Sequence, residues 1–135
     1  MFSKVKEWIE KNDRIPLTKA KNIEEKNKDI NAYVEVFTDL DEYINTAQNK
    51  IDSNQSTLMT GVPIAIKDNM LYKGHIASAS SNMLKNYVAS YSSPVVEELI
   101  NQGAVILGRT NMDEFAMGSS TETSYYGKTL NPLDE

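Results

Sequence analysis

The chain has 135 residues and a formal net charge of −5, with 40% hydrophobic and 24% charged residues. This balance is ordinary for one globular domain, and the acidic charge argues against a surface that binds nucleic acid directly. The sequence has no cysteine, which excludes disulfides and thiol nucleophiles, and its single histidine, His75, cannot build a metal cluster.

Targeting signals are also absent from the sequence pattern. No segment reaches the roughly 18 to 20 consecutive apolar residues of a membrane span. The opening residues, MFSKVKEWIEKND, lack the apolar centre of a signal peptide. We therefore expect a cytoplasmic protein with no membrane segment.

The first sixty residues have the pattern of helices around one short strand. Apolar residues at helical spacing predict a helix over Ser3–Lys11, and the charged run Thr18–Asp29 is compatible with a second. The alternating sequence of Asn31–Phe37, NAYVEVF, predicts a strand. Asp39 is a plausible N-cap for a helix over Leu40–Ile51.

The pattern changes after residue 60 to that of a parallel α/β core. The continuous apolar run Val62–Ile66 predicts a strand buried on both faces. Ser93 is a plausible cap for a helix over Pro94–Gln102, which Gly103 would end. Ala104–Leu107 is again an apolar strand, and a strand, long connection, helix and strand in this order predict parallel pairing.

A short helix is expected after this second apolar strand. Thr110 or Asn111 would cap the sequence MDEFAM, residues 112–117, and Gly118 would end it. Asp113 and its acidic neighbour would then lie near the helix start, where the dipole favours negative charge.

These elements together predict an α/β fold in which amino-terminal helices pack on the first strands of a mixed, largely parallel sheet. Residues 1–60 would form a helical cover and an entry strand, and residues 61–135 would begin the α/β core of the same domain.

Lys67 ends the first apolar strand and is the most informative single residue. Most lysines at strand ends are solvated and structural. If Ala65 and Ile66 held its stem in an apolar wall, the charged ammonium would be disfavoured and a neutral amine could act as a base. Such a base needs a nucleophile within hydrogen-bond reach, and serine or threonine are the candidates that this composition leaves.

Two serine clusters are local candidates for that nucleophile. Ser119 and Ser120 follow Gly118, and this pattern fits an anion-binding turn or, more commonly, a helix-stop glycine with a capping serine. The second cluster, in the sequence IASASS, could line a pocket, but small polar residues more often form a simple loop. It contains Ser78, Ser80 and Ser81.

Three segments taken together resemble the amidase signature family: GVPIAIKDN, VVEELINQGAVILGRTNMDEFAMGSSTETSYYG and the closing NP. The run TNMDEFAMGSSTE is similar to the A-subunit branch of this family, which serves the tRNA-dependent amidotransferases. The resemblance is close over residues 61–134 and looser before them. A hydrolase of another branch, acting on a small amide, is the nearest alternative, and a non-catalytic module that binds other subunits is a further one.

The resemblance implies a mechanism of the Ser–cis-Ser–Lys type, with Lys67 as the catalytic base. In the family both catalytic serines lie in a glycine- and serine-rich loop that follows the NP segment, here Asn131 and Pro132. We therefore expect both serines to lie beyond Glu135 and the 135 residues alone to be inactive. The resemblance also implies that four residues border the substrate pocket: Ala116, Met117, Gly118 and Ser119.

The resemblance further implies partners and cofactors. Glutamine would be the substrate and amide donor, B- and C-type subunits would complete the complex, and tRNA would reach the complex without direct contact with this segment. No cofactor or metal is expected in this chain, because ATP and magnesium are used by the partner subunit. Arg109 departs from the family, which often has lysine at this position.

Overall fold

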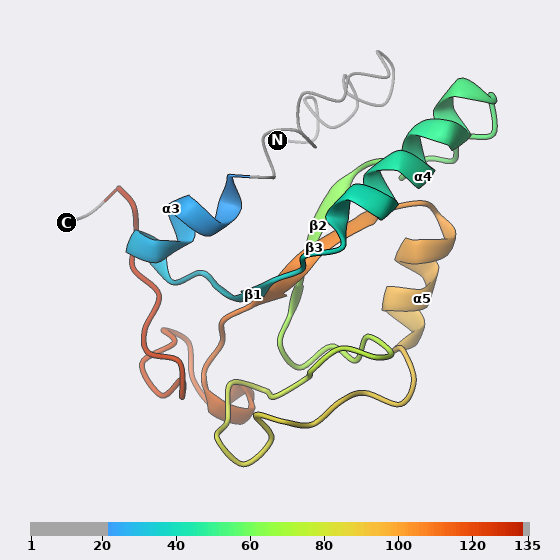
Figure 1. The fold of residues 1–135 in the computed structure, drawn as a ribbon. Coiled ribbons are helices and arrows are strands. Elements are labelled where there is room, and N and C mark those ends of the chain that lie inside the picture. The colour runs from blue at the N-terminus through green and yellow to red at the C-terminus, as the bar shows by residue number, and fades with distance from the viewer. Residues whose placement is uncertain (1–21, 134–135) are drawn as a thin grey trace.

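A computed structural model describes residues 22–133 of the chain (Figure 1). The predicted helix over 3–11 and the start of the second predicted helix lie outside the described residues. The elements are α3 (Ile23–Ile30), β1 (Tyr33–Val36), α4 (Leu40–Asp52), β2 (Pro63–Lys67), α5 (Pro94–Asn101), β3 (Val105–Thr110) and the 3-10 turn η1 (Glu114–Ala116).

The described strands form one mixed sheet in the order β1-β3-β2. The central strand, β3, pairs antiparallel with β1 and parallel with β2. The connection between β2 and β3 carries α5, as a parallel pair requires a crossover. Because β1 lies before residue 60 and β2 and β3 lie after it, the two predicted regions of the chain share this sheet.

Burial differs between the two apolar strands. The first five residues of β3 are buried, whereas in β2 Ala65 is exposed and Ile64 is only partly buried. The prediction that Val62–Ile66 is buried on both faces is therefore wrong for the part of the chain that the structure describes. The physical reason is the strand order, which places β2 at an edge and β3 between two neighbours.

The hydrophobic core joins the sheet to the helices. Val96 of α5 and Val105 of β3 are both 0% exposed, and full burial of a valine stabilises a fold by roughly 1.5–3 kcal/mol. Helix α4 packs on β3 and contributes Leu40 and Ala47 to the same cluster. This apolar contact fixes the position of β3, and through it the ends of the strands that lead to the candidate site.

The helices begin and end close to the predicted residues, but the predicted capping hydrogen bonds are absent at the two helix starts. α4 begins directly after Asp39 and α5 directly after Ser93, but neither side chain makes a capping hydrogen bond. Gly103 follows the last residues of α5 with φ +76°, a left-handed conformation that glycine adopts without a steric cost. The predicted end of this helix is thus confirmed.

Gly108 has a different role in the sheet. A Cβ atom at this position would lie 2.2 Å from the carbonyl oxygen of Glu35 in β1. The registers of both strand pairs slip in the residues next to it. Glycine is needed here because the backbones of β1 and β3 approach too closely for a side chain.

The predicted helix over residues 112–117 does not form. Only the short turn η1 is present, and Phe115 inside it has a left-handed φ of 51°. The side chain of Asn111 accepts the Met112 N–H at 2.9 Å, and the carboxylate of Asp113 accepts N–H groups from residues further along. Such side-chain bonds offer the backbone an alternative to helix, so the helix-dipole explanation for Asp113 is also wrong.

Candidate active site

Lys67 is the last residue of β2 and lies opposite Thr110 of β3. Its side chain is exposed, and it makes no hydrogen bond or ion pair with another of the described residues. The apolar wall expected from Ala65 is absent there, because Ala65 is itself exposed at the sheet edge. Lys67 therefore projects from the carboxyl end of its strand and is available to groups outside residues 22–133.

Asp68 directly follows Lys67 and is buried, with only 1% of its surface exposed. Its Oδ1 accepts hydrogen bonds from Arg109 Nη1 at 2.5 Å and from the Ser78 N–H at 3.2 Å. Its Oδ2 accepts hydrogen bonds from the Ser78 hydroxyl at 2.5 Å and the Ser80 N–H at 2.7 Å. The residue next to Lys67 is thus an anchored, buried carboxylate.

Arg109 supplies the countercharge for this carboxylate from the neighbouring strand. Its Nε donates to Glu35 Oε2 at 2.7 Å, and its guanidinium lies 5.7 Å from the centroid of the Tyr126 ring. Burial alone would lower the pKa of Arg109, but the hydrogen bonds to Glu35 and Asp68 outweigh it, so the pKa stands above its ordinary value. The guanidinium therefore stays charged and binds β1, β3 and the end of β2 together.

The serine cluster after Asp68 forms a loop, as expected, but the loop is buried. Ser78, Ser80 and Ser81 are all 0% exposed. Besides the bonds to Asp68, the Ser80 hydroxyl donates to Asn111 Oδ1 at 3.2 Å and the Ser81 hydroxyl to Glu114 Oε1 at 2.5 Å. Each of these buried hydroxyls already donates a hydrogen bond to another side chain of the protein, which argues against the three serines as nucleophiles.

The serine loop and the loop after β3 are tied together by backbone bonds. The N–H of Phe115 donates to the carbonyl of Ala79 at 3.0 Å, and the N–H of Tyr125 to that of Ser80 at 2.9 Å. Ala79 and Ser80 both have left-handed φ values, 49° and 48°. Figure 1 shows these two loops gathered where β2 and β3 end, which is where ligands bind in many open α/β sheets.

Asp113 anchors the second of these loops. Its Oδ2 accepts the N–H groups of Ser120 at 2.9 Å and Thr121 at 2.8 Å, and its Oδ1 accepts the N–H and hydroxyl of Thr123 at 3.3 and 2.9 Å. These bonds, led by that of the Thr121 N–H, lower the pKa of Asp113 from its ordinary value. The N–H groups of Ser120 and Thr121, which an anion-binding turn would present to a ligand, thus bind a carboxylate of the same chain.

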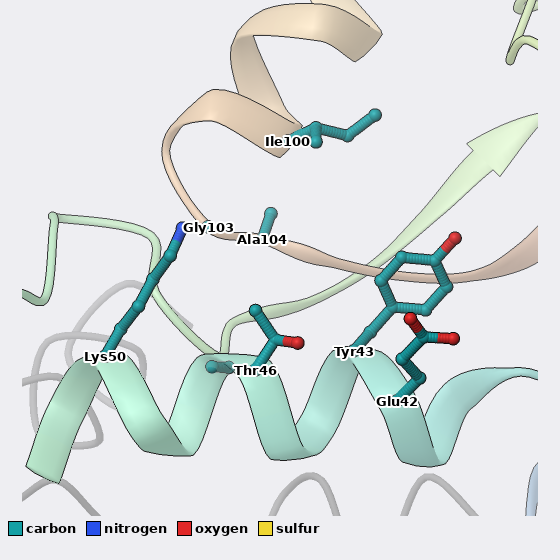
Figure 2. Close-up of a pocket in the computed structure, with 8 residues that line it drawn as sticks. Glu42, Tyr43, Thr46, Lys50, Ile100, Gly103 and Ala104 are labelled. Atoms are coloured by element: carbon teal, nitrogen blue, oxygen red, sulfur yellow. The ribbon is translucent and has the colours of Figure 1, made fainter.

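The predicted substrate-pocket residues begin at Ala116, the last residue of η1, and Ala116, Met117, Gly118 and Ser119 are all exposed. They do not line the pocket of 220 Å³ that lies between α4 and the end of α5 (Figure 2), and neither does Lys67. That pocket is lined by Glu42, Tyr43, Thr46, Ala47, Lys50, Ile100, Gly103 and Ala104.

His75 lies in an aromatic cluster. Its ring stacks on Tyr72 with a centroid distance of 4.2 Å and lies 4.1 Å from the ring of Phe37. The Tyr72 hydroxyl donates to that of Tyr43 at 3.1 Å, and this bond is the main cause that raises the pKa of Tyr43. The cluster packs β1, α4 and the loop after β2 against one another.

Residues 22–133 hold neither a metal cluster nor a membrane-spanning helix. No group of three or more His, Cys, Asp or Glu side chains in this range is placed to hold a metal ion. None of the helices described there is long and apolar enough to cross a bilayer.

The lowered pKa of Asp113 predicts how the loop responds to acid. A carboxylate whose folded-state pKa lies below the ordinary 3.8 stabilises the fold fully above pH 3.8, and this contribution is lost as the pH falls through the folded-state pKa. We expect the amides of Ser120 and Thr121 to be protected from hydrogen exchange at pH 5–6 and to lose protection below pH 3.8. If these two amides keep the same protection, relative to the amides of the sheet, at pH 5–6 and below pH 3.8, the prediction is contradicted.

The sequence pattern indicated Lys67 but not the charged pair beside it. Asp68 and Arg109 each follow an apolar stretch in a different strand, and such charges are buried only when they are paired. Because Lys67 and Thr110 lie opposite each other in a parallel pair, Asp68 and Arg109 had to be close. The parallel pairing predicted for the two apolar strands was the only hint in the sequence, and it needed this register before it could place Asp68 beside Arg109.

The fold and the site place the chain in a class: an α/β protein with a lysine at the carboxyl end of an edge strand and two carboxylate-anchored loops beside it. The amidase family model matches residues 17–135, so the chain belongs to the amidase family. This confirms the resemblance found in the sequence.

The chain is also similar to A subunits of glutamyl-tRNA(Gln) amidotransferases. It is 53% identical, over 116 residues, to the A subunit of glutamyl-tRNA(Gln) amidotransferase from Brachyspira hyodysenteriae, covering 83% of this chain and 24% of the relative. The corresponding A subunit from Campylobacter fetus is 48% identical, with 84% and 23% covered. The chain thus spans about a quarter of the length of these curated relatives.

Solved structures show the same architecture. The A subunit of glutamyl-tRNA(Gln) amidotransferase from Thermotoga maritima matches with a TM-score of 0.74 and 28% identity, covering 96% of this chain and 27% of that one. A chain of a vestigial protein complex connected with the origins of an s-triazine catabolic enzyme matches with a TM-score of 0.85 and 26% identity, covering 98% and 30%. The predicted incomplete amidase signature fold is therefore confirmed.

Proposed function

We propose that this chain is the amino-terminal portion of the amidase subunit of a cytoplasmic tRNA-dependent amidotransferase. That enzyme hydrolyses glutamine and passes the ammonia on, converting Glu-tRNA(Gln) to Gln-tRNA(Gln) or Asp-tRNA(Asn) to Asn-tRNA(Asn). The observation that carries the proposal is the 53% identity to an amidotransferase A subunit over 83% of the chain. B- and C-type subunits are the proposed partners, with ATP and magnesium used by one of them and tRNA bound by the complex.

Lys67 is the proposed general base of this reaction. A serine from sequence beyond residue 135 attacks the carboxamide carbon of glutamine, and its proton passes through a bridging serine to the lysine amine. The lysine then returns this proton through the bridging serine to the amide nitrogen, and the tetrahedral intermediate expels ammonia, leaving an acyl-enzyme that water hydrolyses to glutamate. The exposed position of Lys67 beside the anchored Asp68 supports this role, because the amine can reach groups that the rest of the enzyme supplies.

The segment from Ala116 to Ser119 is the proposed border of the glutamine pocket. Its support is its position after β3: it directly follows Phe115, whose N–H donates to the carbonyl of Ala79 in the loop after Asp68. The exposure of all four residues means that the opposite wall of such a pocket has to come from outside the described residues.

The second candidate is a different amidase that acts on a small amide without tRNA. The observation behind this alternative is that the fold also matches a chain connected with the origins of an s-triazine catabolic enzyme, with a TM-score of 0.85. A non-catalytic module that binds other subunits is the remaining alternative. Co-purification with partner subunits and a requirement for aminoacyl-tRNA in ammonia transfer separate the first proposal from both.

The decisive experiment compares two products of the same gene: the 135-residue chain alone, and the reading frame continued past Glu135 and co-expressed with its neighbouring subunits. We expect the continued product to release ammonia from glutamine and to form Gln-tRNA or Asn-tRNA. The 135-residue chain is expected to release none, because both proposed serines lie outside it. Ammonia release by the short chain, or a continued product active on small amides but not on glutamine, would contradict the proposal.

A further inference from the structure

The loop from Asp113 to Thr123 combines a strained backbone with a carboxylate that binds several of its N–H groups. Phe115, Ala116 and Thr121 have left-handed φ values of 51°, 61° and 65°, a conformation that is strained for residues other than glycine. A strained segment persists only where its surroundings determine its shape. At the start of the loop the Phe115 N–H is held by the carbonyl of Ala79. Over the rest of the loop the carboxylate of Asp113 has this role, since it accepts hydrogen bonds from Ser120, Thr121 and Thr123.

Gly118 shows how closely the loop is wrapped around that carboxylate. A Cβ atom on Gly118 would lie 2.5 Å from Asp113 Cγ and 2.6 Å from Asp113 Oδ1. Glycine at this position is therefore required by the approach of the carboxylate, and it does not end a helix as its neighbours in sequence suggest. The close approach makes the conformation of residues 117–119 depend on where the Asp113 side chain lies.

The anchored loop presents large apolar side chains to solvent. Met117 is 80% exposed and Phe115 is 46% exposed. Holding such side chains on a strained, anchored backbone is costly for stability alone, and strain of this kind gathers at ligand sites. The loop also begins three residues after Thr110, which pairs with Lys67 across the sheet.

We propose that Asp113 is the positioning residue for substrate binding: its carboxylate holds the loop so that Phe115 and Met117 form a fixed apolar wall beside the base. The wall fits the aliphatic stem of an amide substrate, whose carboxamide would then point toward Lys67. This inference rests on the proposed function. It assigns to Asp113 a role in substrate affinity, and none in the bond-breaking steps.

The test compares Asp113→Asn with Glu122→Gln in the product continued past Glu135. Both changes remove one carboxylate charge from the same loop, but Glu122 is exposed and accepts only the Ser120 hydroxyl, at 3.2 Å. Asp113→Asn is expected to raise the KM for glutamine about tenfold, the effect of losing roughly one charge-assisted hydrogen bond. The kcat per active site, counted by acyl-enzyme burst, is expected to change less than about threefold, and Glu122→Gln is expected to change neither.

Hydrogen exchange of the Ser120 and Thr121 amides provides a readout that does not depend on activity. We expect Asp113→Asn to remove their protection, and Glu122→Gln to leave it. If the unsubstituted enzyme hydrolyses glutamine but Asp113→Asn leaves KM unchanged, or if the amides stay protected, the inference is overturned while the proposed function stands. If the unsubstituted enzyme does not act on glutamine, the proposed function itself fails.

Discussion

Replacement of Asp68 by alanine is expected to destabilise the fold by about 3–5 kcal/mol, because removing one partner of a buried ion pair leaves the other uncompensated. The side chain of Asp68 is 0% exposed and that of Arg109 is 6% exposed. The substitution would also leave the N–H groups of Ser78 and Ser80 without the acceptor they now share. Since a single domain has only about 5–15 kcal/mol of stability, much of it would be lost.

Glu35 provides the matched control for this prediction. It binds the same guanidinium, at 2.7 Å, but its side chain is 40% exposed. Exposed ion pairs contribute about 0–1 kcal/mol, so Glu35→Ala is expected to cost much less than Asp68→Ala. Urea denaturation of the 135-residue chain and its two variants, followed by circular dichroism, measures both. Equal losses would show that burial of the Asp68 carboxylate does not decide its contribution.

The elements that could be predicted from the sequence are those set by local pattern. The helix expected over Leu40–Ile51 runs one residue further, and the strand expected within Asn31–Phe37 is present as β1. Gly103 ends α5 as expected, because a left-handed residue after a helix is a local requirement. The spacing of apolar residues and the residues that begin or end a helix lie within or next to each element, so they predict its bounds locally.

The features that were missed depend on partners far along the chain. Arg109 lies 41 residues from Asp68 and 74 from Glu35, so no local pattern links these three charges. The helix expected over 112–117 failed for a related reason: Asp113 binds amides seven to ten residues away in place of its own helical turn. The exposure of Lys67 agrees with the usual behaviour of lysines at strand ends, but the exposure of Ala65 beside it depends on the strand order, which places β2 at the edge of the described sheet.

Lys67→Ala is expected to lower glutamine hydrolysis by the product continued past Glu135 about 10²–10⁴-fold, the usual contribution of a general base. The fold should be unaffected, within about 0.5 kcal/mol, because the Lys67 side chain is exposed and binds no other described residue. Lys73→Ala is the matched control: it removes an exposed lysine from the following loop and is expected to retain full activity.

The Lys67→Arg variant distinguishes two roles of Lys67: accepting a proton as a base, and supplying a positive charge. Arginine keeps a cation at the strand end but cannot lose its proton in a protein, so it should be as inactive as alanine if Lys67 accepts the serine proton. If Lys67 only attracts an anionic substrate group, arginine should restore most of the rate and alanine should mainly raise KM. Steady-state ammonia release by the three variants distinguishes these roles. Substantial activity in Lys67→Arg would remove Lys67 as the base and leave the amidase fold with a different proton acceptor to be found.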